Sequence, residues 1–191
     1  DANTTANSNT AVGKYTLSAN TTGANNTALG AESLASNTTA SSNTAVGYQA
    51  LNANTTAANN TAVGTGSLDA STTGASNTSI GAYALTTSTT GASNVAVGVS
   101  ALEANTTASN NTAVGTNALV SNTTGTQNIS VGTSAGQNVT TGNYNICIGY
   151  DSRTSAVGSS AQIVIGSSVI GTANNAVFIG TSAGHVRNDF L

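Results

Sequence analysis

Side chains capable of catalysis are scarce in this 191-residue sequence, and one group of them stands together: His185, Arg187 and Asp189. A histidine beside a carboxylate can act in acid-base catalysis or bind a metal ion. However, the chain has one His and one Cys, and no carboxylates at acid-base or metal-ligand spacing. We therefore expect no catalytic residue, enzymatic activity, metal or cofactor, and interpret the cluster as a surface or contact group.

Two further features resemble chemical motifs but lack the essential residues. The glycines recur periodically and lack the lysine of a phosphate-binding loop. Calcium-binding β-roll repeats need an Asp in each turn, and the chain has four Asp residues in all. The lone cysteine, Cys147, stands in a column that Ala, Ser or Val otherwise fill, so we interpret it as a small buried residue.

Composition excludes several classes of partner. Lys and Arg number three and the net charge is −3, so no basic stripe is present to neutralise nucleic acid phosphates. The chain has no run of 18 apolar residues, so we expect no membrane insertion. Disordered chains combine low hydrophobicity with high net charge, whereas 38% of this chain is hydrophobic, which favours an ordered structure.

A fixed period organises the sequence. The glycine that closes each AVG-like triplet recurs every 17 residues nine times, and a last copy, Gly180, follows after 14. The regularly spaced copies are Gly13, Gly30, Gly47, Gly64, Gly81, Gly98, Gly115, Gly132, Gly149 and Gly166. Asn, Thr, Ser and Gly are weak helix formers, and no 3.6-residue stripe is present. The sequence therefore predicts an all-β fold, a parallel β-solenoid (β-roll) of about eleven coils.

The predicted rod has a regular part and an irregular part. Each coil has room for two short strands and two tight turns, and coils about 4.8 Å apart would build a rod on the order of 50 Å long. Residues 1–149 are predicted to form regular coils. Residues 150–191 lose the NTTG segment and are predicted to form irregular coils, a cap or a transition. The chain begins inside a unit and without Met, which indicates a fragment or processed product.

Two apolar columns are candidates for the core. The residue before each glycine is always aliphatic, so we expect it to point inward. The residue two positions earlier, such as Thr10, is expected to point the same way, in an inward or half-buried position. This predicted core ladder is Val12, Leu29, Val46, Val63, Ile80, Val97, Val114, Val131, Ile148, Ile165 and Ile179. A second ladder, four residues after the glycine, is Leu17, Leu34, Leu51, Leu68, Leu85, Leu102 and Leu119. The small column that begins at Ala11 is then expected to form a flat outer face.

An asparagine recurs four residues before each regular glycine through Gly149. These residues are Asn9, Asn26, Asn43, Asn60, Asn77, Asn94, Asn111, Asn128 and Asn145. Asn favours turns and tolerates left-handed backbone conformations. The pattern predicts a ladder of amides, each bonded to its neighbour and to the turning backbone.

A rod this thin buries little apolar surface on its own. Association would bury the flat small-residue face, and closed threefold symmetry would do so without open-ended growth. We therefore expect a homotrimer with the small-residue column near the subunit contacts.

The units NTAVG, NTSIG, NICIG and NNAVFIGTSAG resemble the repeats in the head domains of trimeric autotransporter adhesins, which are trimeric parallel β-rolls. The longer form NTAVGYQALNANTT is similar to arrays in phage tail-fibre proteins. The resemblance covers roughly residues 1–184, and the unit is longer than the adhesin-head unit, which favours a fibre. It implies a non-enzymatic fibre segment, extracellular or on a virion surface, that supports host attachment through a glycan or protein receptor.

Two alternative functions remain open. A bacterial surface adhesin would use exposed aromatic residues, Tyr15, Tyr48, Tyr83 and Tyr150, to contact host or matrix ligands. An ice-binding protein would use threonine ladders, for which adjacent Thr-Thr pairs such as Thr72-Thr73 recur in every regular unit. Ice-binding faces usually need Thr at i and i+2, because adjacent residues of a strand point to opposite sides.

Overall fold

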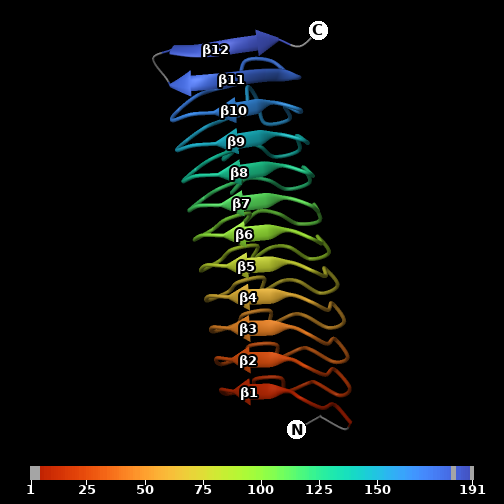
Figure 1. Cartoon of the computed structure of the whole chain (residues 1–191). Coiled ribbons are helices and arrows are strands. Elements are labelled where there is room, and N and C mark those ends of the chain that lie inside the picture. The colour runs from red at the N-terminus through yellow and green to blue at the C-terminus, as the bar shows by residue number, and fades with distance from the viewer. Residues whose placement is uncertain (1–4, 182–183, 190–191) are drawn as a thin grey trace.

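The chain winds into a β-solenoid whose successive coils stack along one axis (Figure 1). The computed structural model describes residues 5–181 and the backbone of 184–189, and this part contains no helix. All twelve strands form one sheet in sequence order. They are β1 (Thr10–Val12), β2 (Thr27–Leu29), β3 (Thr44–Val46), β4 (Thr61–Val63), β5 (Thr78–Ile80), β6 (Val95–Val97), β7 (Thr112–Val114), β8 (Ile129–Val131), β9 (Ile146–Ile148), β10 (Ile163–Ile165), β11 (Ala176–Thr181) and β12 (Gly184–Asp189).

The strands keep the register of the repeat. From β1 to β10, each residue pairs in parallel with the residue 17 positions later, as Thr44 does with Thr61. From β10 to β11 the offset is 14, since Ile163 pairs with Val177. β12 then runs antiparallel to β11 at the C-terminal end of the stack. The predicted all-β parallel solenoid is confirmed.

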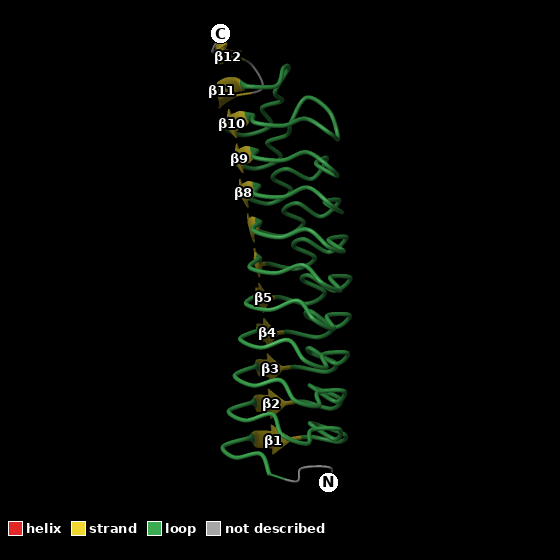
Figure 2. Ribbon diagram, turned by 90° about the vertical axis from the view of Figure 1, so that its right-hand side faces the viewer, coloured by secondary structure: helices red, strands yellow, loops and turns green. Residues whose placement is uncertain are grey.

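Each regular coil contains one three-residue strand, where we expected two. The strands line one side of the rod, and turns and loops form the rest of each coil (Figure 2). The reason is backbone conformation, because several residues per coil have positive φ. In the third coil these are Ser42 (61°), Gly47 (129°), Gln49 (56°) and Leu51 (54°). A left-handed residue interrupts an extended segment, so no second strand forms.

The core contains the leucine ladder and small residues. Leu34, Leu51, Leu68, Leu85, Leu102 and Leu119 are fully buried, and Leu17 packs partly buried against the same cluster. The central residue of each strand from β2 to β10 is also buried, and it is Ala in β2, β3, β4, β6 and β7. Each coil from Leu17 to Leu119 thus contributes one leucine, together with methyl-sized side chains, to a narrow interior.

The prediction that the aliphatic column before each glycine points inward is wrong, and so is the prediction that Thr10 and its equivalents do. In β2, for example, Ala28 is buried while Thr27 and Leu29 are exposed. Side chains alternate along each strand as expected, but the two faces are exchanged: the middle residue points inward and the residues on either side of it point outward. A shift of one residue along a strand moves every side chain to the other face. The leucines from the opposite wall fill the interior, so only a small side chain fits beneath the strand.

The glycine that directly follows each strand is required for two reasons. Gly47 has a φ of 129°, and a Cβ there would lie 2.6 Å from the carbonyl oxygen of Gly64 in the next coil. Neither the conformation nor the space suits an L side chain.

The core changes near the C-terminal end. The leucine column ends at Gly136, where a Cβ would lie 3.0 Å from Cδ2 of Leu119. A second hydrophobic cluster then begins, consisting of Ala135, Cys147, Val164, Val169, Ala176 and Phe178. Arg153, in the leucine column, is partly exposed and bonds to Asp151 instead of entering the core.

We predict that Leu85→Ala lowers the free energy of unfolding by about 2–5 kcal/mol, because a fully buried leucine leaves a cavity. Val99→Ala, at a side chain 49% exposed, is the control and should change stability by about 0.5 kcal/mol or less. Urea denaturation measures both. A larger loss for Val99→Ala would contradict the assignment of inside and outside.

Candidate interaction surface

The outward residues of the sheet form one continuous surface along the rod. We define the outer sheet face as the first and third residues of β1 to β10 with Val177 and Ile179 of β11. The first-position residues are Thr10, Thr27, Thr44, Thr61, Thr78, Val95, Thr112, Ile129, Ile146 and Ile163. The third-position residues are Val12, Leu29, Val46, Val63, Ile80, Val97, Val114, Val131, Ile148 and Ile165. All of them are Thr or aliphatic, so the face carries no charge.

The outer sheet face is large for a surface left in water. Val12, Leu29 and Ile179 are 57%, 48% and 49% exposed. A strip of eleven strands about 4.8 Å apart and two side chains wide covers on the order of 500 Å², which is at the upper end for the largest patch on a monomeric protein. Its ends differ: threonine fills the first position from β1 to β5, and an aliphatic residue fills it from β8 to β11.

The amides of the predicted asparagine ladder lie inside the coil, and the structure contains the hydrogen bonds that this prediction requires. Asn77 Nδ2 donates to the carbonyl of Gly91 at 2.8 Å, and Asn77 Oδ1 accepts the Asn94 N–H at 2.9 Å. Bonds from an Asn N–H to the amide oxygen one coil earlier recur from Asn26 to Asn145 at 2.8–3.0 Å. Gln162 continues the series at 3.1 Å. The left-handed residue of this turn is the one just before the Asn, such as Ser76.

A second amide column, seven residues after the glycine, was not predicted from the sequence. Asn37 Nδ2 donates to Asn20 Oδ1 at 2.8 Å, and Asn54 Nδ2 donates to Asn37 Oδ1 at 2.9 Å. The next two positions are Ser71 and Ser88, and Asn54 Oδ1 and Ser88 Oγ are buried without a hydrogen-bond partner. The recurrence of NTT every 17 residues was the available signal.

The Thr-Thr pairs divide between two roles. The first threonine is partly buried and its hydroxyl donates to a carbonyl of the next coil, as Thr72 does to Thr89 at 3.3 Å. The second is exposed, as Thr73 is. The two members therefore do not form a common outward face.

The predicted tyrosine contacts are exposed at turns that follow strands. Tyr15, Tyr48, Tyr83 and Tyr150 have exposed fractions of 58%, 48%, 51% and 61%. The first three lie on coils of β1, β3 and β5, and Tyr150 follows β9. The structure thus separates Tyr150 from the other three by several coils.

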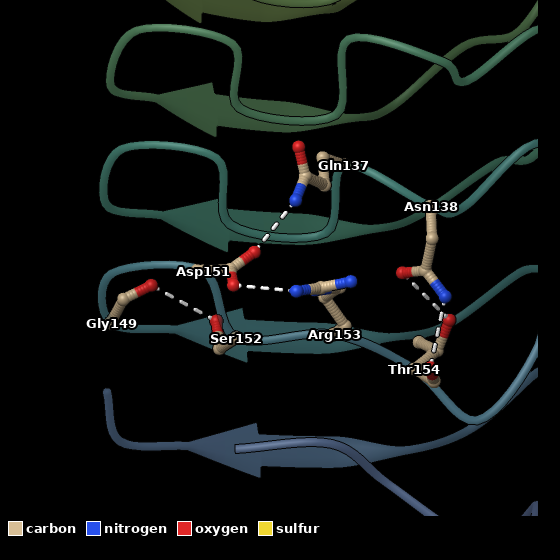
Figure 3. A network of polar contacts seen from close by, with 7 residues as sticks. All are labelled: Gln137, Asn138, Gly149, Asp151, Ser152, Arg153 and Thr154. Carbon is tan, nitrogen blue, oxygen red and sulfur yellow. Dashed lines mark hydrogen bonds and ion pairs between the residues drawn. The ribbon is translucent and has the colours of Figure 1, made fainter. Parts of the chain in front are cut away.

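A polar network surrounds the end of the regular array (Figure 3). Asp151 accepts hydrogen bonds from Gln137 Nε2 and Arg153 Nη2, both at 2.6 Å. Asn138 Nδ2 donates to the carbonyl of Thr154 at 2.9 Å. These bonds link two coils where the leucine column is lost, so the network has a clear structural role.

The predicted group of His185, Arg187 and Asp189 falls on β12, and its side chains lie outside the described residues. Among the described residues, no group of three or more His, Cys, Asp or Glu side chains could hold a metal ion. The same part of the chain has no helix of the length and apolarity that a membrane span requires.

The chain matches no family model, and no curated protein or solved structure is significantly similar to it. The outer sheet face, the amide ladders and the tyrosines are therefore interpreted from their own geometry.

We predict that Asn77→Ala costs about 2–4 kcal/mol, because it leaves the Asn94 N–H and the Gly91 carbonyl buried without their partner. Thr73→Ala, at an exposed residue of the same coil, should be nearly neutral. Chemical denaturation of the two variants compares these costs. Equal stability would show that the ladder contributes nothing.

We predict that the Cys147 thiol is unreactive in the folded protein. Burial raises its pKa from 9.0 to about 12. A raised thiol pKa favours the protonated folded state, so its contribution to stability is present below pH 9 and is lost between pH 9 and about 12. Titration with a thiol reagent at pH 8 should label the protein only in denaturant. Rapid labelling of the native protein would refute the prediction.

Proposed function

We propose that this chain is a non-enzymatic structural segment of a phage tail fibre or related surface fibre, and that it assembles as a homotrimer through the outer sheet face. The observation that carries the proposal is an uncharged, largely aliphatic strip that follows the whole array. Extended apolar patches on soluble proteins mark interaction sites.

The site of self-association differs from the one expected from sequence. The small-residue column lies inside the coil, so it is not available to a partner. The aliphatic column is available instead. Three outer sheet faces brought together would remove on the order of 1,500 Å² from water, which is within the range of stable interfaces.

The difference in composition between the two ends of the outer sheet face favours chains that run parallel to one another around a rotation axis. An antiparallel pair would place the threonine end, at β1 to β5, against the aliphatic end, at β8 to β11. Parallel chains place like residues at the same height, so the aliphatic ends bury one another. A closed threefold arrangement satisfies this and stops further growth.

Such an assembly would work by rigidity. Each coil is bonded to the next by backbone and amide hydrogen bonds, as in the bond from Asn94 N–H to Asn77 Oδ1. A fibre segment of this kind would hold a receptor-binding part away from the particle and thereby support host attachment.

Ice binding is a second candidate, and one observation favours it. Thr44 and Val46 point outward at i and i+2 of β3, with Val in place of a second Thr, and equivalent Thr-Val pairs recur on β1, β4 and β7. This is the spacing that the Thr-Thr pairs lack. Ice binding requires the outer sheet face to remain free of other chains, so ice binding and trimer assembly through this face exclude each other.

Light scattering on the purified protein tests the proposal. We expect three times the chain mass of 18.4 kDa. Ile148→Glu should give a folded monomer, because it places a charge in the interface, whereas Thr141→Glu, at an exposed residue off the face, should remain a trimer. Circular dichroism confirms folding. A wild-type monomer at micromolar concentration would overturn the fibre proposal, and thermal hysteresis by that monomer would support ice binding.

A further inference from the structure

One turn position carries an unusual set of side chains on the first five coils. It is the second residue after the glycine that follows each strand. We define the tyrosine strip as the residues at this position on the first five coils: Tyr15, Glu32, Gln49, Gly66 and Tyr83. These residues have nearly the same left-handed φ, 59°, 61°, 56°, 61° and 59°. Because the backbone repeats, the side chains leave successive coils in similar directions. At about 4.8 Å per coil, Tyr15 and Tyr83 are about 19 Å apart along the rod.

The two tyrosines at the ends of the strip expose their rings. The Tyr83 ring packs on Gly66 of the preceding coil, where a Cβ would lie 3.0 Å from Cδ1 and 3.2 Å from Cε1. The side chain is still 51% exposed, so the ring lies on the backbone and presents surface to solvent. The Tyr15 side chain is 58% exposed, with Lys14 Nζ 4.6 Å from the ring centroid.

Hydrogen-bonding groups lie between the rings. Gln49 Nε2 donates to Glu32 Oε2 at 2.8 Å, which leaves the amide oxygen of Gln49 and the second carboxylate oxygen of Glu32 for other partners. Tyr48, next to Gln49, is 48% exposed. Burial, and after it the charge of Glu32, raises the pKa of the Asp69 carboxyl group.

We propose that the tyrosine strip binds a neutral, extended β-linked polysaccharide chain that lies along the rod. The apolar faces of sugar rings stack on exposed aromatic rings. Sugar hydroxyl groups donate to and accept from carboxylate and amide groups, which lie midway along the strip. A straight strip about 19 Å long fits an extended oligosaccharide. The Glu32 carboxylate would repel an anionic polymer and the Lys14 ammonium beside Tyr15 would repel a cationic one, so the ligand is a neutral one.

The site is confined to the coils of β1 to β5. The same turn position continues as Ser100, Asn117, Ser134, Asp151 and Ser168, with no aromatic residue. The strip shares no residue with the outer sheet face, so the proposal goes beyond the structural function and is tested separately from it.

Calorimetric titration with cellohexaose, chitohexaose and mannohexaose tests the proposal. We expect at least one of them to bind, and Tyr15→Ala and Tyr83→Ala each to weaken binding by about three- to tenfold through loss of stacking. Gly66→Ala should also weaken it, because the new Cβ displaces the Tyr83 ring. Its backbone should tolerate the change, since Glu32 and Gln49 are accommodated at nearly the same φ.

Tyr144→Ala is the matched control, since Tyr144 is 59% exposed at a different turn. It should bind as the wild type does. The proposal is overturned if no hexasaccharide binds at millimolar concentration, if Tyr144→Ala loses as much affinity as Tyr83→Ala, or if an oligogalacturonate binds more tightly than the neutral sugars. Light scattering on the same variants measures their oligomeric state, so that a loss of sugar binding can be distinguished from a change in assembly.

Discussion

The hydrogen bonds between equivalent residues of successive coils are the constraint on which the structure depends. A residue in one parallel strand pairs with the residue 17 positions later, so each side chain lies beside its own equivalent about 4.8 Å away. A column can hold only residues that tolerate a copy of themselves at that distance. Amides satisfy the condition by bonding to the next coil, and glycines by leaving room for it. The repeat in the sequence follows from this condition.

The narrow interior determines which apolar residues face water. Leucines from one wall meet alanines from the strand, as Leu85 does in the cluster that contains Ala96. No space remains for the valines and isoleucines, which lie outside on the sheet. A coil of 17 residues therefore cannot bury all of its apolar side chains. The unburied ones fall in line along the sheet, which is the physical basis for the proposed self-association.

Departures from the repeat have local structural consequences. Ser71 and Ser88 interrupt the second amide column and leave Asn54 Oδ1 without a partner. Gly136 ends the leucine column, and a polar network around Asp151 links the coils beyond it. Gly66 provides the flat surface on which Tyr83 lies. These sites, more than the regular columns, distinguish one part of the rod from another.

The sequence alone determined the period, the parallel solenoid and the first amide ladder, because each depends only on which residue types recur every 17 positions. It also identified the buried leucine column and could have revealed the amide column at Asn37. It did not determine which side of the strand faces inward. In Thr-Ala-Val, the alternation of side chains is equally consistent with burying the alanine and with burying the threonine and the valine. Apolarity alone favours burying Val46 over Ala45. Only the tertiary structure decided for Ala45, because the opposing leucines and the left-handed turns leave room for only a small side chain beneath the strand.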